Sequence, residues 1–205
     1  LVTGVNVSRL TAGLNQPFRI ATGQHNTLDN VLFSLELGDG TQGFGEAAIA
    51  THITGETLEE TTRNLELIGQ DLLGQDIADY LRLANDAVGK LANNQCALAA
   101  VEMAILDAFT RQLKIPLWKF FGSNSRCRRF ATDITIVLGT LEEAEKSTRA
   151  YYQKGFRAFK IKIGKDQDLD FKRVQLVHKT SRKCPLYLDA NQGYSAQETL
   201  AFLKR

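Results

Sequence analysis

The sequence has few of the features that mark specialised classes of protein. Its three cysteines lie far apart with no C-x-x-C spacing among the 205 residues, which excludes a disulfide-stapled scaffold. No apolar run approaches the roughly 20 residues that span a bilayer. Charges of the two signs nearly balance, with 25 Lys and Arg against 23 Asp and Glu. Because no overall field of one sign results, we expect neither a nucleic-acid nor a membrane partner.

The composition that remains is typical of an ordinary globular protein. Hydrophobic residues make up 43% of the chain and charged residues 23%, and the length suits one large domain or two modest ones. No basic segment followed by an apolar run opens the sequence. Together with the unpaired cysteines, this pattern favours reduced thiols and a cytoplasmic location.

Residues 1–125 are predicted to form an α+β domain in which a β meander precedes helices. Strands are expected at residues 5–7, 31–37 and 43–47, with a hairpin turn at Asp39-Gly40. Residues 11–30, rich in Thr, Asn, Gln and Gly, are expected to form a long loop that is functional or mobile. Helical periodicity follows from a Thr57…Glu60 capping box, and helices are expected near residues 57–72, 77–88 and 94–113. Small residues on two faces of the last helix predict close packing.

Residues 126–205 are predicted to form three βα units. Strands are expected at residues 133–138, 158–163 and 186–189, each followed by a helix, and this alternation predicts a parallel sheet with right-handed crossovers. Eight such units would need roughly 200 residues beyond position 130 to close a barrel. The segment is therefore either an open sheet or the first part of something larger.

Two lysines share one face of the second of these strands. Alternation places Lys160 and Lys162 opposite the apolar side chains at positions 159, 161 and 163. Parallel strands are normally buried on both faces, so the segment is either an edge strand with a wetted face or a functional site. Two neighbouring ammonium groups disfavour each other's charge, which would lower the pKa of at least one and suit it to act as a base.

Asp189 ends the next strand, at the edge where parallel α/β sheets place their ligands. An Asp in this position is often a turn former, and the following Asn191-Gln192-Gly193 supports a turn. Its carboxylate is also a hard oxygen donor suited to Mg²⁺. Together the segments predict proton abstraction beside a carboxylate, with Lys162 as the base, Lys160 tuning it, and Mg²⁺ on Asp189 neutralising the enediolate that forms.

The meander and helices, the segment Lys160-Ile161-Lys162 and residues 188–193 (LDANQG) together resemble the muconate-lactonising branch of the enolase superfamily along the whole chain. Residues 53–56, 100–104 and 132–135 are similar to the dipeptide epimerases, whose best-known activity is on L-Ala-D/L-Glu. The resemblance implies a capping domain followed by the first βα units of an incomplete (β/α)8 barrel. It also implies a Mg²⁺-dependent isomerase that acts on a dipeptide.

The same resemblance assigns roles to individual residues. Lys162 is the base on one face of the substrate, Lys160 is its partner, and Asp189 is the first Mg²⁺ ligand, with Asn191 beside it. Thr135 lies at the substrate pocket. The remaining acidic ligands, the lysine of the opposite face and an Asp-x-Asp motif belong to later strands, so we expect these 205 residues to be inactive on their own.

Loops of the capping domain select the substrate in this family, and that role is assigned here to Gln24 and His25. Glutamate-specific members carry an arginine in this loop, which residues 21–25 lack. Arg19 or His25 could replace it, and a neutral or hydrophobic dipeptide is equally compatible. The alternatives are a cycloisomerase, an o-succinylbenzoate synthase, or an incomplete fragment without activity. We also expect a homo-oligomer.

Overall fold

The computed structural model describes residues 1–122 and 130–205, so the expected domain boundary between residues 125 and 126 lies outside the described residues. The chain divides into two compact units. One consists of residues 1–13 and 27–128, and the other of residues 14–26 and 129–205. Among the described residues, no helix has both the length and the apolar character that crossing a membrane requires.

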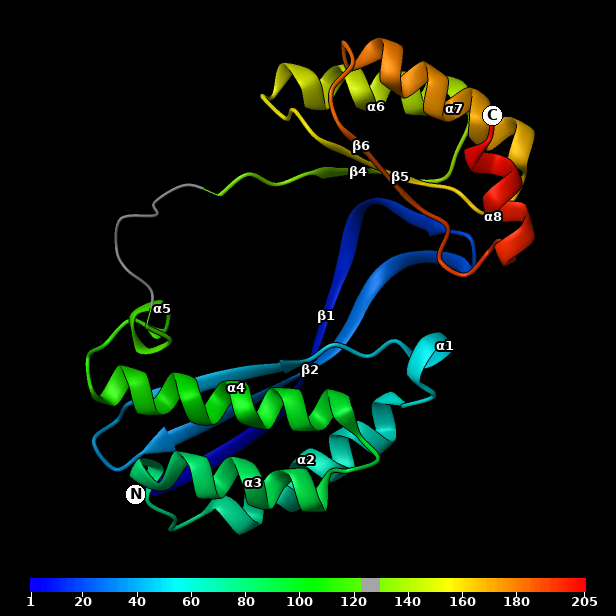
Figure 1. Ribbon diagram of the computed structural model, residues 1–205. Coiled ribbons are helices and arrows are strands. Elements are labelled where there is room, and N and C mark those ends of the chain that lie inside the picture. The colour runs from blue at the N-terminus through cyan, green and yellow to red at the C-terminus, as the bar shows by residue number, and fades with distance from the viewer. Residues whose placement is uncertain (123–129) are drawn as a thin grey trace. The chain divides into compact units, whose positions relative to one another are not determined.

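The first unit contains the predicted β meander, which the structure confirms (Figure 1). Strands β1 (Val2–Ile20), β2 (Gly23–Leu37) and β3 (Gln42–Ala47) follow one another in the sheet, and β2 pairs with β3 antiparallel. Alternate residues Phe33, Leu35 and Leu37 are buried in the core of this unit, as a half-buried strand requires.

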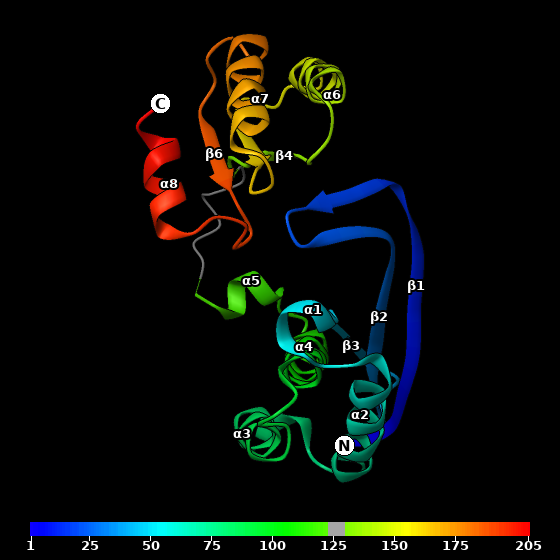
Figure 2. The same cartoon turned by 90° about the vertical axis from the view of Figure 1, so that its right-hand side faces the viewer.

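The loop expected over residues 11–30 is wrong, because β1 and β2 continue through it as a hairpin with a turn at residues 21–22. Figures 1 and 2 both show the two strands running side by side to this tip. Most side chains of this segment are exposed or half-buried on both faces. A two-stranded ribbon of this kind buries no apolar face, so it lacks the alternation that marks a strand in a sequence.

Helix α4 (Gln95–Gln112) packs very closely on β3, as its small residues predict. A Cβ atom added at Gly43 would lie 2.3 Å from the carbonyl oxygen of Ala104, and one at Gly45 would lie 1.8 Å from that of Ala100. Glycine is therefore required at both positions of the strand. The other helical segments of this unit are α1 (Thr51–Thr54), α2 (Leu58–Leu72), the 3-10 turn η1 (Ile77–Asp79), α3 (Tyr80–Lys90) and α5 (Leu117–Phe120).

The second unit contains a parallel sheet in the order β4-β5-β6, which confirms the predicted βα alternation. Its strands are β4 (Ile134–Ile136), β5 (Phe159–Lys162) and β6 (Leu186–Asp189), and its helices are α6 (Leu141–Gln153), α7 (Gln167–Thr180) and α8 (Ala196–Leu203). The capping boxes Thr140…Glu143 and Ser195…Glu198 both form and open α6 and α8. Because β5 is the central strand, the edge-strand interpretation of its two lysines is wrong.

Candidate active site

The register of the parallel sheet gathers polar side chains on one face. Thr135 pairs with Lys160 across β4 and β5, and Lys162 pairs with Asp189 across β5 and β6. Residues in register on neighbouring strands point to the same side, and so do alternate residues of one strand. The opposite face of β5 carries the fully buried side chains of Phe159 and Ile161.

The structure brings Lys160, Lys162 and Asp189 together, and we call these three residues the lysine–aspartate cluster. Both lysine Nζ atoms lie 2.8 Å from Oδ2 of Asp189. The side chain of Lys162 is 7% exposed and that of Lys160 is 36% exposed. The amine of Lys162 is therefore held in a largely water-excluded position, whereas that of Lys160 remains in contact with solvent.

A tight turn after β6 orients the remaining polar group of the site. The N–H of Gly193 donates to the carbonyl of Ala190 at 2.8 Å, and both central residues have positive φ, 45° at Asn191 and 65° at Gln192. This is the pattern of a type I′ turn, in which Asn is well tolerated. Oδ1 of Asp189 accepts the N–H of Asn191 at 2.9 Å. Asp189 is thus both a turn former and a member of the cluster.

The turn also directs Asn191 at the buried lysine. Nζ of Lys162 donates to Oδ1 of Asn191 at 2.7 Å, in addition to its bond with Asp189. The same Nζ lies 5.7 Å from the centre of the Phe18 ring on β1, within cation–π distance. Sequence reasoning missed Phe18 because its segment was expected to be a loop, and an aromatic residue in an otherwise polar stretch was the available signal.

The tip of the β1–β2 hairpin packs against the loops that follow β5 and β6. A Cβ added at Gly164 or at Gly193 would approach the Cβ of Ala21 to 3.0 Å and 2.8 Å. The N–H of Leu138 also donates to the carbonyl of Arg19 at 3.2 Å. Residues 14–26 therefore pack against the carboxyl end of the parallel sheet, where the lysine–aspartate cluster lies.

Charges within the cluster stabilise one another. Hydrogen bonds from Lys160 and Lys162 hold the pKa of Asp189 well below its usual range, and the bond to Asp189 raises the pKa of Lys160. Neighbouring amines are expected to lower the pKa of at least one of the two lysines. Lys160 is not that lysine, because the carboxylate between the amines raises its pKa. The protonated amine of Lys160 places positive charge on this face of the sheet, which suits a site where negative charge develops.

The residues assigned to substrate binding lie on two elements, Gln24 and His25 on β2 and Thr135 on β4. Gln24 accepts a hydrogen bond from Nε of Arg19 at 3.1 Å and donates one to Asn26 at 2.9 Å. It lines a cavity of about 360 Å³ together with Arg19, Gly23 and residues of α7. His25 is half-buried and, as the next residue of the strand, points to the opposite face of the hairpin. Thr135 is also half-buried.

A Mg²⁺ ion would find one suitable ligand in the cluster. Asp189 supplies carboxylate oxygens at a strand end, a donor that Mg²⁺ prefers. Among the described residues, no group of three or more His, Cys, Asp or Glu side chains could hold a metal ion. Asp189 therefore fits as one ligand of a site that needs further oxygen donors.

Two protein families match successive parts of the chain. Residues 3–122 match the N-terminal domain of the mandelate racemase/muconate lactonizing enzymes, and residues 142–205 match the enolase C-terminal domain-like family. The chain is 45% identical over 201 residues to a hydrophobic dipeptide epimerase of Citrifermentans bemidjiense, covering 97% of this chain and 55% of that protein. It is 35% identical over 205 residues to an aromatic dipeptide epimerase of Herpetosiphon aurantiacus, covering 98% and 56%.

A solved structure is similar over nearly the whole chain. The dipeptide epimerase of Methylococcus capsulatus, crystallised with Mg and the dipeptide L-Arg-D-Lys, superposes with a TM-score of 0.90 at 29% identity. The match covers 99% of this chain and 57% of that one. The chain thus spans a little over half the length of the relatives that it matches.

Proposed function

Because the chain belongs to the mandelate racemase/muconate lactonizing enzyme family, we propose that the whole protein is a Mg²⁺-dependent isomerase that epimerises a dipeptide. The chain combines the family's N-terminal capping domain of strands and helices with part of its C-terminal domain. One observation carries the proposal for this site, which is the contact of Lys160 and Lys162 with the carboxylate of Asp189.

In this proposal Lys162 removes the α-proton of the dipeptide. The α C–H bond breaks, its electron pair moves toward the substrate carboxylate, and the proton passes to the uncharged amine of Lys162. Asn191 and Phe18 hold that amine in place at 2.7 Å and 5.7 Å. Lys160, protonated beside Asp189, adds positive charge on the same face of the sheet.

Asp189 is the residue here that would hold Mg²⁺, and the ion when bound would offset the negative charge that develops on the substrate. Return of a proton to the opposite face requires a second acid. We expect that acid, and the further ligands, in parts of the protein that these 205 residues do not span, so the chain alone is expected to be inactive. A homo-oligomer belongs to the same proposal.

We further propose a dipeptide with a neutral, hydrophobic side chain as the substrate. Two relatives that cover most of this chain are named for hydrophobic and aromatic dipeptides. In addition, the guanidinium of Arg19 is engaged by Glu143 at 3.3 Å and by Gln24 at 3.1 Å. An acidic substrate side chain would have to displace Glu143 to pair with it.

Isotope exchange in the full-length protein tests both parts. The reaction is run with Mg²⁺ in D₂O, and the gain of α-deuterium is followed by proton NMR. L-Ala-L-Leu should gain deuterium at least about tenfold faster than L-Ala-L-Glu, which corresponds to a preference of about 1.4 kcal/mol. Lys162→Ala should abolish exchange from at least one enantiomer, whereas Lys172→Ala, at an exposed position of α7, should leave it unchanged. Undiminished exchange in Lys162→Ala would remove this lysine from the mechanism, and faster exchange of L-Ala-L-Glu would refute the hydrophobic preference.

A further inference from the structure

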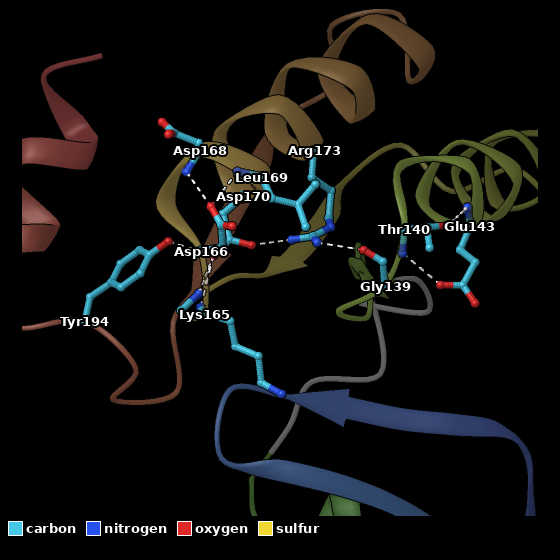
Figure 3. Close-up of polar contacts among 11 residues, drawn as sticks. Gly139, Thr140, Glu143, Lys165, Asp166, Asp168, Leu169, Asp170, Arg173 and Tyr194 are labelled. Carbon is cyan, nitrogen blue, oxygen red and sulfur yellow. Dashed lines mark hydrogen bonds and ion pairs between the residues drawn. The ribbon is translucent and has the colours of Figure 1, made fainter.

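Helix α7 carries a buried ion pair formed by Asp170 and Arg173 (Figure 3). Asp170 and Arg173 are 1% and 2% exposed, and Nη1 of Arg173 contacts Oδ1 of Asp170. The other oxygen of Asp170 accepts three hydrogen bonds, from the N–H groups of Gly164 at 2.7 Å and Lys165 at 3.3 Å and from the hydroxyl of Tyr194 at 2.6 Å. Burial and the Asp170 carboxylate raise the pKa of Tyr194, which keeps its hydroxyl protonated as a donor.

The pair reaches the loops that follow all three strands of the parallel sheet. Nη2 of Arg173 donates to the carbonyl of Gly139 at 2.7 Å, in the loop after β4. Gly164 lies in the loop after β5, two residues beyond Lys162, and Tyr194 lies in the loop after β6. Figure 3 shows Asp170 between Tyr194 on one side and Arg173 on the other, with Arg173 directed at Gly139.

Stability alone gives a weak reason for a charged pair at this position. Burying two charges carries a desolvation penalty that their attraction often does no more than repay, and apolar side chains of similar volume commonly serve a core as well or better. Moreover, Nε of Arg173 is buried without a hydrogen-bond partner in the described part of the chain, which adds a cost. An apolar pair, however, could not bind the backbone of the loops after β4 and β5 and the hydroxyl of Tyr194 in the loop after β6.

We infer that the Asp170–Arg173 pair is a positioning device that fixes the three loops relative to one another and thereby sets the geometry of the lysine–aspartate cluster. Its hydrogen bonds go to loop backbone and to Tyr194, so Asp170 and Arg173 are positioning residues and do not contact the cluster itself. The inference rests on the proposed function, because the reaction is what requires the amine of Lys162 to be placed accurately.

The test uses Asp170→Asn and Tyr194→Phe in the full-length protein. Asp170→Asn should lower kcat for α-deuterium exchange at least about tenfold and Tyr194→Phe about threefold, with KM changed less than twofold, because position rather than binding is affected. Hydrogen exchange followed by mass spectrometry should show faster exchange of the amides at residues 164–165 in both variants. The matched control is Glu145→Gln, which breaks an exposed ion pair on α6 and should change none of these quantities.

Each outcome decides the inference. Unchanged kcat in both variants would overturn it, and so would a loss of kcat that only follows the folded fraction measured by circular dichroism. Tyr194→Phe deletes a single hydroxyl, so it serves if Asp170→Asn does not fold. A wild-type protein that exchanges no α-proton would refute the proposed function and this positioning role with it. An active wild type with unaffected variants would refute the positioning role alone.

Discussion

Replacing Gly193 by alanine should disturb the site more than the fold. The added Cβ would lie 2.2 Å from the carbonyl oxygen of Gly164, 2.9 Å from that of Ala190 and 2.8 Å from the Cβ of Ala21. All three atoms belong to backbone or to a short side chain, so none can turn away. The loops after β5 and β6 must therefore separate, and the hairpin tip must shift with them.

The distances at Gly193 determine the expected loss of stability and the expected loss of rate. Bringing the 2.2 Å contact to an ordinary separation requires a displacement of about 1 Å. Overpacking of this kind costs about 1–3 kcal/mol, and the lower chain entropy of alanine in the unfolded state returns about 0.4–1 kcal/mol. We expect a net loss of about 1–2 kcal/mol in the free energy of unfolding. A misplacement of about 1 Å between reacting groups can cost about 100-fold in rate, so kcat should fall about 10- to 100-fold.

Urea unfolding and α-deuterium exchange in the full-length protein measure the two quantities. Gly13→Ala is the control from the same hairpin, because an added Cβ there has no neighbour within 4 Å. It should raise the free energy of unfolding by no more than about 0.4–1 kcal/mol and leave the rate unchanged. If Gly193→Ala kept the kcat of the wild type, the close approach of the two loops would not matter for the reaction and the reasoning would be refuted.

Two further predictions concern a hydrogen bond at the site and a thiol in the first unit. Asn191→Gly and Asn191→Ala both remove the hydrogen-bond acceptor of Lys162 and should lower kcat about tenfold. The glycine variant should be about 1 kcal/mol more stable than the alanine variant, because φ at this position is 45°. A fully active glycine variant would show that the acceptor is dispensable. Burial and the Glu56 carboxylate, 2.8 Å from Sγ, raise the pKa of Cys96 to about 11, so iodoacetamide should modify it at pH 8 about 100-fold more slowly than in the urea-unfolded chain. The stability that this raised pKa contributes should be present below pH 9 and lost as the pH rises toward 11. Glu56→Gln should speed the modification of Cys96. Equal modification rates in the folded and unfolded protein would contradict the raised pKa.

Local patterns in the sequence predict most of the fold. The spacings Thr140…Glu143 and Ser195…Glu198 can be recognised in the sequence, and both form capping boxes at the starts of α6 and α8, because a cap depends on residues three positions apart. The hairpin formed by residues 14–26 could not be predicted in this way. Its strands are stabilised by pairing with each other and by contact with the loops after β5 and β6, neither of which leaves an apolar period in the sequence.

The sequence indicates that Asp170 and Arg173 are buried on α7, but it does not indicate their partners. Asp170, Arg173 and Val177 lie at i, i+3 and i+7 on α7, the spacing of a buried helix face, and all three are buried. Charged residues at two of these positions are unusual enough to indicate a polar network. The partners in that network, Gly139 and Tyr194, are far away in the sequence and follow only from the parallel arrangement of the strands.

The raised pKa of Lys160 has its origin in the register of the sheet. Considered alone, two amines on one strand face repel each other; the pairing of Lys162 with Asp189 across β5 and β6 places a carboxylate between them. A slip of one residue would turn Asp189 to the opposite face, because strand side chains alternate. That slip is opposed by Leu186, which packs against the core of this unit on the other face of β6. The alternation that forms the core therefore also determines which side chain the amine of Lys162 meets, and core and site cannot vary independently along this strand.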